Sequence, residues 1–326
     1  MDWLTIILVV FGLSLFEIIS SIDNAIINAE VLRTMSPRAR KWFLIWGILI
    51  AVFVIRGLLP FAILWASNPS FSIGQVISAA MSSDPAVLKT IEESSHVLLV
   101  GGGTFLVFLF LHWLFLEPKH YGIETEKLIE KHGVWFYAAV SAVLATLVWI
   151  SIKLNPMIAF GAVIGSTAFF ITHGFKENAA QMEEKLKHKQ KNGMSDISKL
   201  LYLEVIDATF SIDGVLGAFA FTLAIPLILI GNGIGAIVVR QLTIKGITEI
   251  KKYRYLKNGA MYSVGALGIV MLLEGFGIHI PVWVSPVITF AIVGYFFWKS
   301  VVYYKAHHRP HKTNAHHKNK KSKNRK

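Results

Sequence analysis

The sequence contains no cysteine among its 326 residues. Disulfides, thiolate metal sites and thiol redox chemistry are therefore excluded. The chain also has no HExxH, GxSxG or protease-type paired aspartyl motif, so we do not expect an enzyme. No cleavable signal pattern opens the chain, because Asp2 stands where a basic residue is expected and the first apolar run is long. We expect this run to remain in the protein as a membrane span.

Charged residues are scarce as well, at 16%, whereas 54% of the residues are hydrophobic. Apolar runs of about 20 residues recur along the chain, which is typical of a polytopic helical membrane protein. We predict an all-α fold with about nine transmembrane helices, and a short surface or re-entrant segment at 70–81. The nine predicted spans cover residues 3–30, 41–66, 96–116, 134–152, 157–174, 198–222, 226–245, 259–278 and 282–304.

The net charge of +12 is distributed unevenly between the spans. Basic residues number 4, 3, 6, 5 and 10 in the segments 31–41, 117–133, 175–199, 245–258 and 299–326. The alternate segments hold only Lys89 and Lys153. By the positive-inside rule, we predict a bacterial cytoplasmic membrane protein with its N-terminus outside and its C-terminus in the cytoplasm. The charge is thus a signal of topology, and we expect no nucleic-acid partner.

Two acidic stretches resemble each other, "FEIISSIDNAI" at 16–26 and "IDATFSIDGVL" at 206–216. Each contains Ser-Ile-Asp, and each has a carboxylate four residues before the serine. In the first stretch these residues are Glu17, Ser21 and Asp23, followed by Asn24. In the second stretch they are Asp207, Ser211 and Asp213, and Glu204 precedes them by one helical turn. The match predicts an internal repeat.

The spans that follow also match. Arg56 comes nine residues after Gly47, and Arg240 nine residues after Gly231. A weaker match places His112 nine after Gly103 and Glu274 nine after Gly265. The second copy starts five spans after the first, an odd number, so the second runs opposite to the first, as in secondary transporters with a mid-membrane site. Within a membrane domain at 1–304, we predict repeat one at 1–116, linking helices at 134–174, repeat two at 198–278 and a last helix at 282–304.

On an ideal helix, Glu17, Ser21 and Asn24 share one stripe. Asp207 and Ser211 form the matching stripe in the second copy. Asp23 and Asp213 lie about 120° away, six residues beyond the first acid of each copy. Either these two aspartates have other partners, or the helices unwind near Ser-Ile-Asp.

The predicted spans contain at least five acids, whereas Arg56 and Arg240 are their only two arginines. Ion pairs serving structure alone would leave excess negative charge, so we favour protons or a metal cation as partners. Oxygen ligands suit Mg²⁺, Ca²⁺ and Mn²⁺. The acids are Glu17, Asp23, Glu204, Asp207 and Asp213. We assign gating or charge-balancing roles to Arg56, Arg240, Ser21, Ser211, His112 and Glu274.

The doubled acidic helix, with "SIDN" early and "SIDG" late and an arginine-bearing helix after each, resembles the TerC family of membrane proteins. The resemblance implies an exporter of the LysE-type grouping, with Mn²⁺ as the leading substrate and links to tellurite resistance. It also implies that Glu17, Asp23, Asp207 and Asp213 bind metal beside Asn24. Gly214 departs from the serine of many relatives, so the second half-site could rely more on Glu204.

Other functions remain open at this stage. The same site could carry Ca²⁺, H⁺ or a small cationic solute, and a non-transporting scaffold for envelope complexes could use the acids for helix packing. The chain ends in a basic stretch, 305–326, that contains five histidines from His307 onward and no acid. We expect this tail to be a disordered anchor to anionic lipid. No tightly bound cofactor is expected.

Overall fold

The computed structural model describes residues 2–47, 50, 54, 56–67, 72–81, 85–188, 195–245 and 252–307. Throughout these residues the secondary structure is helical, with no strand. The basic tail beyond residue 307 lies outside the described residues, so its anchoring role stays a prediction. The helices are α1 (Trp3–Ser20), α2 (Ile22–Arg33), α3 (Pro37–Trp42), η1 (Phe43–Gly47), α4 (Arg56–Ser67), α5 (Ile73–Met81), α6 (Pro85–Leu116), α7 (Glu124–Glu130), α8 (Trp135–Leu154), α9 (Pro156–His188), α10 (Asp196–Ala218), α11 (Ile225–Lys245), α13 (Leu256–Gly275) and α14 (Val284–His307).

The chain is an all-α, polytopic membrane protein. Seven stretches of the described helices are long and apolar enough to cross a bilayer. The predicted span 41–66 lies partly outside the described residues. The predicted span 198–222 corresponds to α10, which is long enough but carries four carboxylates along its length. The seven stretches are Trp3–Ser20, Ser95–Leu116, Trp135–Leu154, Pro156–Glu177, Ile225–Thr243, Leu256–Gly275 and Val284–His307.

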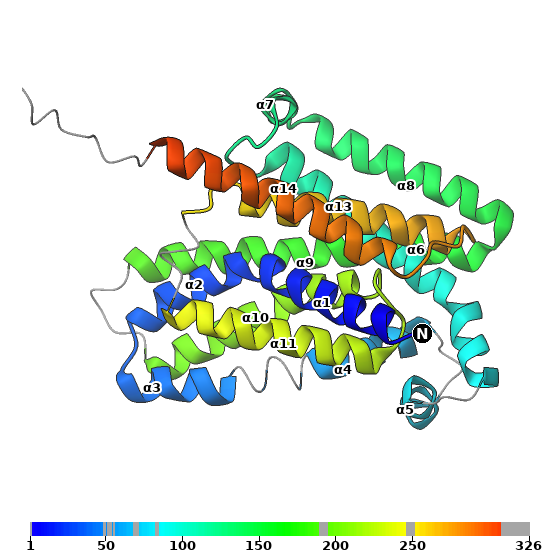
Figure 1. The fold of residues 1–326 in the computed structure, drawn as a ribbon, viewed down its shortest axis with the longest axis horizontal. Coiled ribbons are helices and arrows are strands. Elements are labelled where there is room, and N and C mark those ends of the chain that lie inside the picture. Colours follow the sequence, from blue (N-terminus) through cyan, green and yellow to red (C-terminus); the bar gives the residue numbers. More distant parts are fainter. Residues whose placement is uncertain are drawn as a thin grey trace, which may run out of the picture.

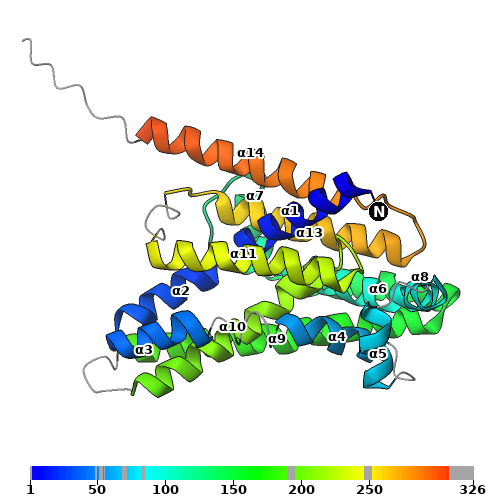
Figure 2. The same cartoon turned by 60° about the horizontal axis from the view of Figure 1, so that its bottom comes forward.

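The helices form a bundle in which the start of α1 and the C-terminal end of α14 lie at opposite ends (Figure 1). Helix α5 lies at the same end as the start of α1, and α3 lies at the same end as the C-terminal end of α14 (Figures 1 and 2). That the first end is external and the second cytoplasmic stays a prediction. Large apolar side chains such as Trp149, Phe160 and Trp298 are exposed on the outer helices, as expected of a surface that faces lipid.

The first predicted span bends at Ser21, where α1 ends and α2 begins. The backbone there has φ −92° and ψ 2°, outside the helical range. Hydrogen bonds still cross the bend, since the Ser21 N–H donates to Glu17 O at 3.1 Å and the Ala25 N–H donates to Ser21 O at 2.9 Å. The bend is therefore a kink. α10 continues without interruption through the second Ser-Ile-Asp, so the two copies differ here.

Helices α6 and α13 pack closely through glycines that the repeat pairs with each other. A Cβ on Gly103 would lie 2.9 Å from Cγ of Leu272, which is seven residues after Gly265. A Cβ on Gly265 would lie 2.7 Å from Cγ of Phe110, which is seven residues after Gly103. Reciprocal contacts of this kind are what a two-fold relation requires. The contacts fit the predicted inverted repeat, with an axis passing between these two helices.

Cysteine labelling can test the predicted topology, because the natural chain has no cysteine. Ile73 and Ile197 are both exposed, at 67% and 69%, so single Cys replacements there should preserve the fold. We expect a membrane-impermeant maleimide to label Ile73→Cys in intact spheroplasts and Ile197→Cys only after the membrane is opened. The cysteine-free parent gives the background. Labelling of both positions from the same side would contradict the inverted topology.

Candidate functional site: two carboxylates between the repeats

Glu17 lies on α1, one turn before the kink, and only 1% of its surface is exposed. Its Oε1 accepts a hydrogen bond from Ser21 Oγ at 2.7 Å, so the predicted stripe residues do meet. Two glycines leave room for this side chain. A Cβ on Gly235 of α11 would lie 2.6 Å from Glu17 Cβ, and a Cβ on Gly214 of α10 would lie 3.1 Å from Oε2.

The second contact gives a physical reason for Gly214, which the sequence showed only as a departure from the family pattern. A side chain at this position would approach Glu17 Oε2 more closely than ordinary van der Waals contact allows. Gly214 thus allows Glu17 to sit against the backbone of α10. The close packing of α1 on α11 also depends on a glycine. A Cβ on Gly235 would lie 2.8 Å from the carbonyl oxygen of Ser14.

Asp207 lies on α10 and is also buried. Its Oδ1 accepts hydrogen bonds from the side-chain amides of Asn24, in a very short contact, and Asn28, at 3.1 Å. Ser211, the equivalent of Ser21, bonds to the backbone of this aspartate. Its Oγ donates to the backbone oxygen of Asp207 at 2.5 Å. The structure therefore joins Asp207 to the α2 half of the first acidic stretch.

These contacts are reciprocal, as at the α6–α13 interface. Glu17 faces Gly214, seven residues after Asp207, and Asp207 bonds to Asn24, seven residues after Glu17. The two acids are equivalent in the predicted repeat, and each meets the other copy at the equivalent place. Glu17 and Asp207 are thus the centres of two groups of contacts across one interface, here called the two half-sites, and this arrangement fits the predicted repeat.

Several buried oxygens near these acids have no hydrogen-bond partner among the residues that the structure describes. The asparagines give their N–H groups to Asp207, which leaves Oδ1 of Asn24 and Asn28 without a donor. Oδ1 of Asn232, one turn before Gly235 on α11, and both carboxylate oxygens of Glu204 are in the same situation. Burying such a group without a partner costs about 1–3 kcal/mol, more if it is charged. Oxygens left without donors are what a cation would need as ligands.

Asp213 points away from the two half-sites. Its Oδ2 forms a very short ion pair with Lys176 of α9. Sequence reasoning had two alternatives for this aspartate, and the structure gives it a different partner on a straight helix. The sequence did not point to Lys176 as a partner. This residue follows the end of an apolar run and belongs to the basic segment 175–199, which was predicted to be cytoplasmic. The nearby His173, three residues earlier, is the only hint of a polar face on α9.

The remaining predicted residues are more scattered. The side chains of Asp23 and Arg56 lie outside the described residues. No carboxylate pairs with Arg240 among the residues that the structure describes, and its Nε is buried without an acceptor. Glu274 is half-buried at the far end of α13, with no side-chain hydrogen bond or ion pair in the described part of the chain. Within that part, no three His, Asp or Glu side chains gather closely enough to hold a metal by themselves.

His112 joins a second polar cluster at the C-terminal end of α6. Its Nδ1 lies 3.5 Å from Oε1 of Glu117, and the other oxygen of Glu117 lies 2.9 Å from Nζ of Lys257 on α13. Burial alone would raise the pKa of Glu117, but the hydrogen bond from His112 and the charge of Lys257 outweigh it and lower this pKa to about 2. Glu117 is therefore a fixed negative charge at neutral pH.

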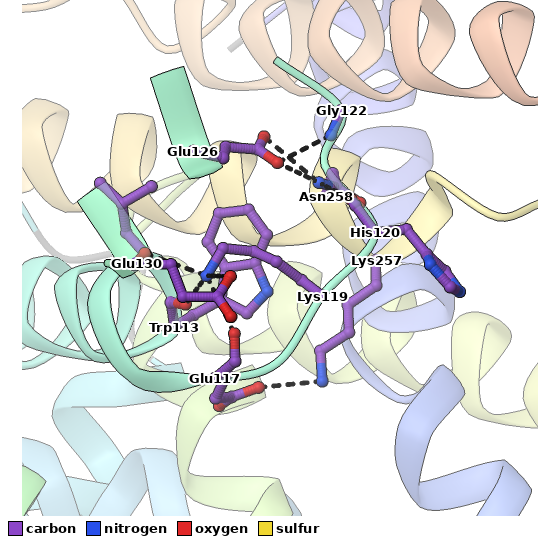
Figure 3. Close-up of polar contacts among 10 residues, drawn as sticks. Trp113, Glu117, Lys119, His120, Gly122, Glu126, Glu130, Lys257 and Asn258 are labelled. Carbon is purple, nitrogen blue, oxygen red and sulfur yellow. Dashed lines mark hydrogen bonds and ion pairs between the residues drawn. The ribbon is translucent and has the colours of Figure 1, made fainter. Parts of the chain in front are cut away.

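Buried polar contacts fix the position of the segment 117–133, which follows α6 (Figure 3). Lys119 Nζ donates to the carbonyls of Trp113 and Leu114 at 2.7 and 2.9 Å, which caps the end of α6. The fully buried Glu126 accepts from the Gly122 N–H at 2.7 Å and from Asn258 Nδ2 at 3.0 Å. Sequence reasoning treated 117–133 as a plain basic loop and missed Glu126, whose spacing from Gly122 carries no distinctive signal.

Comparison with known proteins agrees with the membrane character of the fold. Residues 22–307 match the profile of a family described as "Protein of unknown function (DUF475)". The chain belongs to this family. No curated protein and no solved structure shows significant similarity to it. The match covers the whole second acidic stretch, but it begins at residue 22, so residues 16–21 of the first stretch, with Glu17 and Ser21, lie before it. The family description leaves the activity open, so the function has to be argued from the site.

The fit between Glu17 and α11 can be tested with two glycines of one helix. Gly235→Ala should lower the melting temperature of the protein in detergent, because the added methyl group meets Glu17 Cβ and the Ser14 carbonyl. Overpacking of this kind costs about 1–3 kcal/mol. Gly233→Ala is the matched control, since a Cβ there has nothing within 4 Å. Equal melting temperatures for the two variants would contradict the described packing of α1 on α11.

The low pKa of Glu117 predicts a pH dependence of stability. Its folded pKa of about 2 lies below the ordinary value of 4.5, so the ionised group stabilises the folded state above about pH 4.5. This contribution is lost as the pH falls from 4.5 toward 2. Thermal melts from pH 7 to pH 3 should show the wild type more stable than Glu117→Gln, with the difference shrinking below pH 4.5. A constant difference over that range would argue against the described contacts of Glu117.

Proposed function

We propose that this protein is a membrane transporter that exports a hard divalent cation, with Mn²⁺ as the first candidate. The observation that carries the proposal is the pair of buried acidic half-sites, Glu17 and Asp207, at the interface between inverted copies. A fully buried pair of carboxylates in a membrane bundle is costly unless it serves structure or binds a cation. Transporters with inverted repeats place their substrate at such an interface.

The ligand chemistry supports a hard cation. The two half-sites offer carboxylate, amide and hydroxyl oxygens, and the described contacts around them include no histidine. Oxygen-only sets favour Mg²⁺, Ca²⁺ and Mn²⁺ over Zn²⁺ and Cu⁺, which prefer nitrogen and sulfur ligands. Among these hard ions, the resemblance of the acidic motifs to the TerC family favours Mn²⁺. Asn24 and Asn28 would contribute their unpartnered oxygens without adding charge.

The acids divide into three roles in this proposal. Glu17 and Asp207 bind the cation. Glu204, one helical turn closer to the cytoplasmic end of α10, receives the cation before it reaches Asp207. Asp213 is neutralised by Lys176, so we assign it to charge balance, whereas the sequence had assigned it to metal binding. Asp23 stays a proposed ligand, as the resemblance implies. We place the basic ends of the bundle in the cytoplasm, and the proposal includes no enzymatic step.

Thermal melts with and without Mn²⁺ test this assignment. A ligand at about 100 times its Kd stabilises a protein by about 2.7 kcal/mol, which gives a shift of several degrees. We expect this shift in the wild type and its loss in Glu17→Gln and Asp207→Asn, with the metal-free proteins still folded. Asp213→Asn is the matched control from the same helix. It should melt earlier without metal, because Lys176 loses its partner, and it should keep the Mn²⁺ shift.

Opposite behaviour would favour a scaffold. Variants at Glu17 and Asp207 that melt early yet keep the wild-type shift would show that these acids serve helix packing. A shift with Ca²⁺ but not with Mn²⁺ would keep the site and change its ion. Mn²⁺ flux in proteoliposomes then decides between binding and transport, and binding without flux would overturn the transport proposal.

A further inference from the structure

Two histidines face each other between α6 and α9, outside the proposed cation site. The ring centroids of His112 and His173 are 3.9 Å apart, at an interplanar angle of 52°. His112 is 8% exposed, and His173 is half-buried. Aromatic rings enclose the pair, with Phe136 of α8 at 5.5 Å from His112 and Phe169 of α9 stacked at 5.7 Å on His173. Neither histidine has a role in the proposed binding of the cation.

The charged groups that face the pair come from each of the surrounding helices. They are Glu117, directly after the end of α6, and Lys176 and Glu177 of α9. Behind them, Asp213 of α10 contacts Lys176, and Lys257 of α13 contacts Glu117. Helix α8 presents Phe136 and no charge in the described contacts. Glu117 keeps its charge, since its pKa is about 2, and Lys176 is paired with Asp213. Imidazole is the side chain whose ordinary titration falls between pH 5 and 8, so the histidines are the groups here that can respond in that range.

The geometry allows the pair one proton. Two positive charges on rings whose centroids are 3.9 Å apart repel each other strongly in a partly buried site, so a second proton on the pair is opposed by the first. The carboxylate of Glu117, with its Oε1 3.5 Å from Nδ1 of His112, stabilises a single positive charge on the pair. A proton taken from water forms one N–H bond on one imidazole, and its release breaks that bond. Nothing is oxidised or reduced in either direction.

Helix α10 connects this pair to the cation site through two consecutive residues. Gly214 faces Glu17, and Asp213 forms the ion pair with Lys176, one turn after His173. A positive charge on the histidine pair is therefore close to the Asp213–Lys176 ion pair. This ion pair in turn lies next in the chain to Gly214, which faces Glu17 of the proposed cation site. Like charges repel, so a proton on the pair and a cation in the site oppose each other.

We propose that His112 and His173 form a one-proton binding site that lowers the cation affinity when it is protonated. The inference rests on the proposed function and gives it a proton-coupling group. Such coupling is reciprocal. Binding of the cation lowers the affinity of the pair for the proton by the same factor by which the proton lowers the affinity of the site for the cation. An exporter gains direction from this opposition, since a proton that enters from outside favours release of the cation.

Imidazole NMR on ¹⁵N-histidine-labelled, metal-free protein tests the one-proton site by itself. We expect one histidine of the pair to take up a proton between pH 5 and 8 while the other stays neutral throughout. In His173→Gln, the resonance of His112 should persist and titrate alone, and in His112→Gln the remaining His173 should become able to titrate. If both histidines of the wild type titrate together in this range, or neither does, the one-proton site is overturned. His173→Asn serves if the glutamine variant fails to fold.

The Mn²⁺ concentration at half-maximal thermal shift, followed from pH 5.5 to 7.5, tests the coupling. We expect this Mn²⁺ concentration to increase on acidification in both proteins. The increase should be about tenfold larger in the wild type than in His112→Gln/His173→Gln, which is a typical size for coupling between sites. The carboxylates contribute equally to both proteins. His132→Gln, an exposed histidine with only a backbone contact, should behave like the wild type. Equal pH dependence in the wild type and the double variant overturns the coupling.

The two arms separate failure of this inference from failure of the proposed function. If the wild type shows no Mn²⁺ shift at any pH, the proposed cation site falls and the coupling falls with it, whereas the imidazole spectra still decide the one-proton site. If the shift is present and the double variant keeps the wild-type pH dependence, the cation site stands and the coupling to the histidine pair is overturned.

Discussion

The structure depends on one constraint, which is that carboxylates inside a membrane bundle need partners within the protein. Water is absent there, so each acid has to meet a hydroxyl, an amide, a basic group or an ion. Glu17 meets a serine, Asp207 meets two asparagines, and Asp213 meets a lysine. Each solution draws on a different helix, so the acids determine which helices lie together. The kink at Ser21 and the straight course of α10 are two ways of satisfying the same requirement.

Close packing follows from the same constraint. The partner of a short acidic side chain has to lie close to it. Helices approach each other that closely only where small residues lie at their interface. Glycines occupy these places in matched pairs: Gly103 and Gly265 between α6 and α13, and Gly214 and Gly235 around Glu17. The sequence shows these glycines as unremarkable members of apolar runs. Their role becomes visible only where a side chain or carbonyl from another helix occupies the position of the absent Cβ.

The sequence was sufficient for the helical membrane fold, and it identified the acidic stretches that contain Glu17 and Asp207. Both are encoded locally, by apolar runs of membrane length and by polar residues at helical spacing within them. It was insufficient for partners from distant helices, because the contacts of Asp207 with Asn28 and of Asp213 with Lys176 depend on how helices cross. Lys176, His173 and Glu126 belong to segments whose composition is ordinary for a membrane edge, and only the fold brings them to buried positions.

The two copies are equivalent in position but unequal in chemistry, and the inequality has a direction. Ser14 precedes Glu17 by three residues, and its hydroxyl donates to the carbonyl of Gly231 at 3.0 Å. Glu204 precedes Asp207 by three residues, and its carboxylate fills the space beside Gly47, the glycine that the repeat pairs with Gly231. The paired glycines thus lie beside a neutral hydroxyl in one case and beside a carboxylate in the other. Under the proposed transport function, a cation approaching along α10 would meet an additional carboxylate, whereas one approaching along α1 would meet a serine. An inverted repeat with identical halves would present the same surroundings to the ion from both sides of the membrane, and the difference between Ser14 and Glu204 removes that equality.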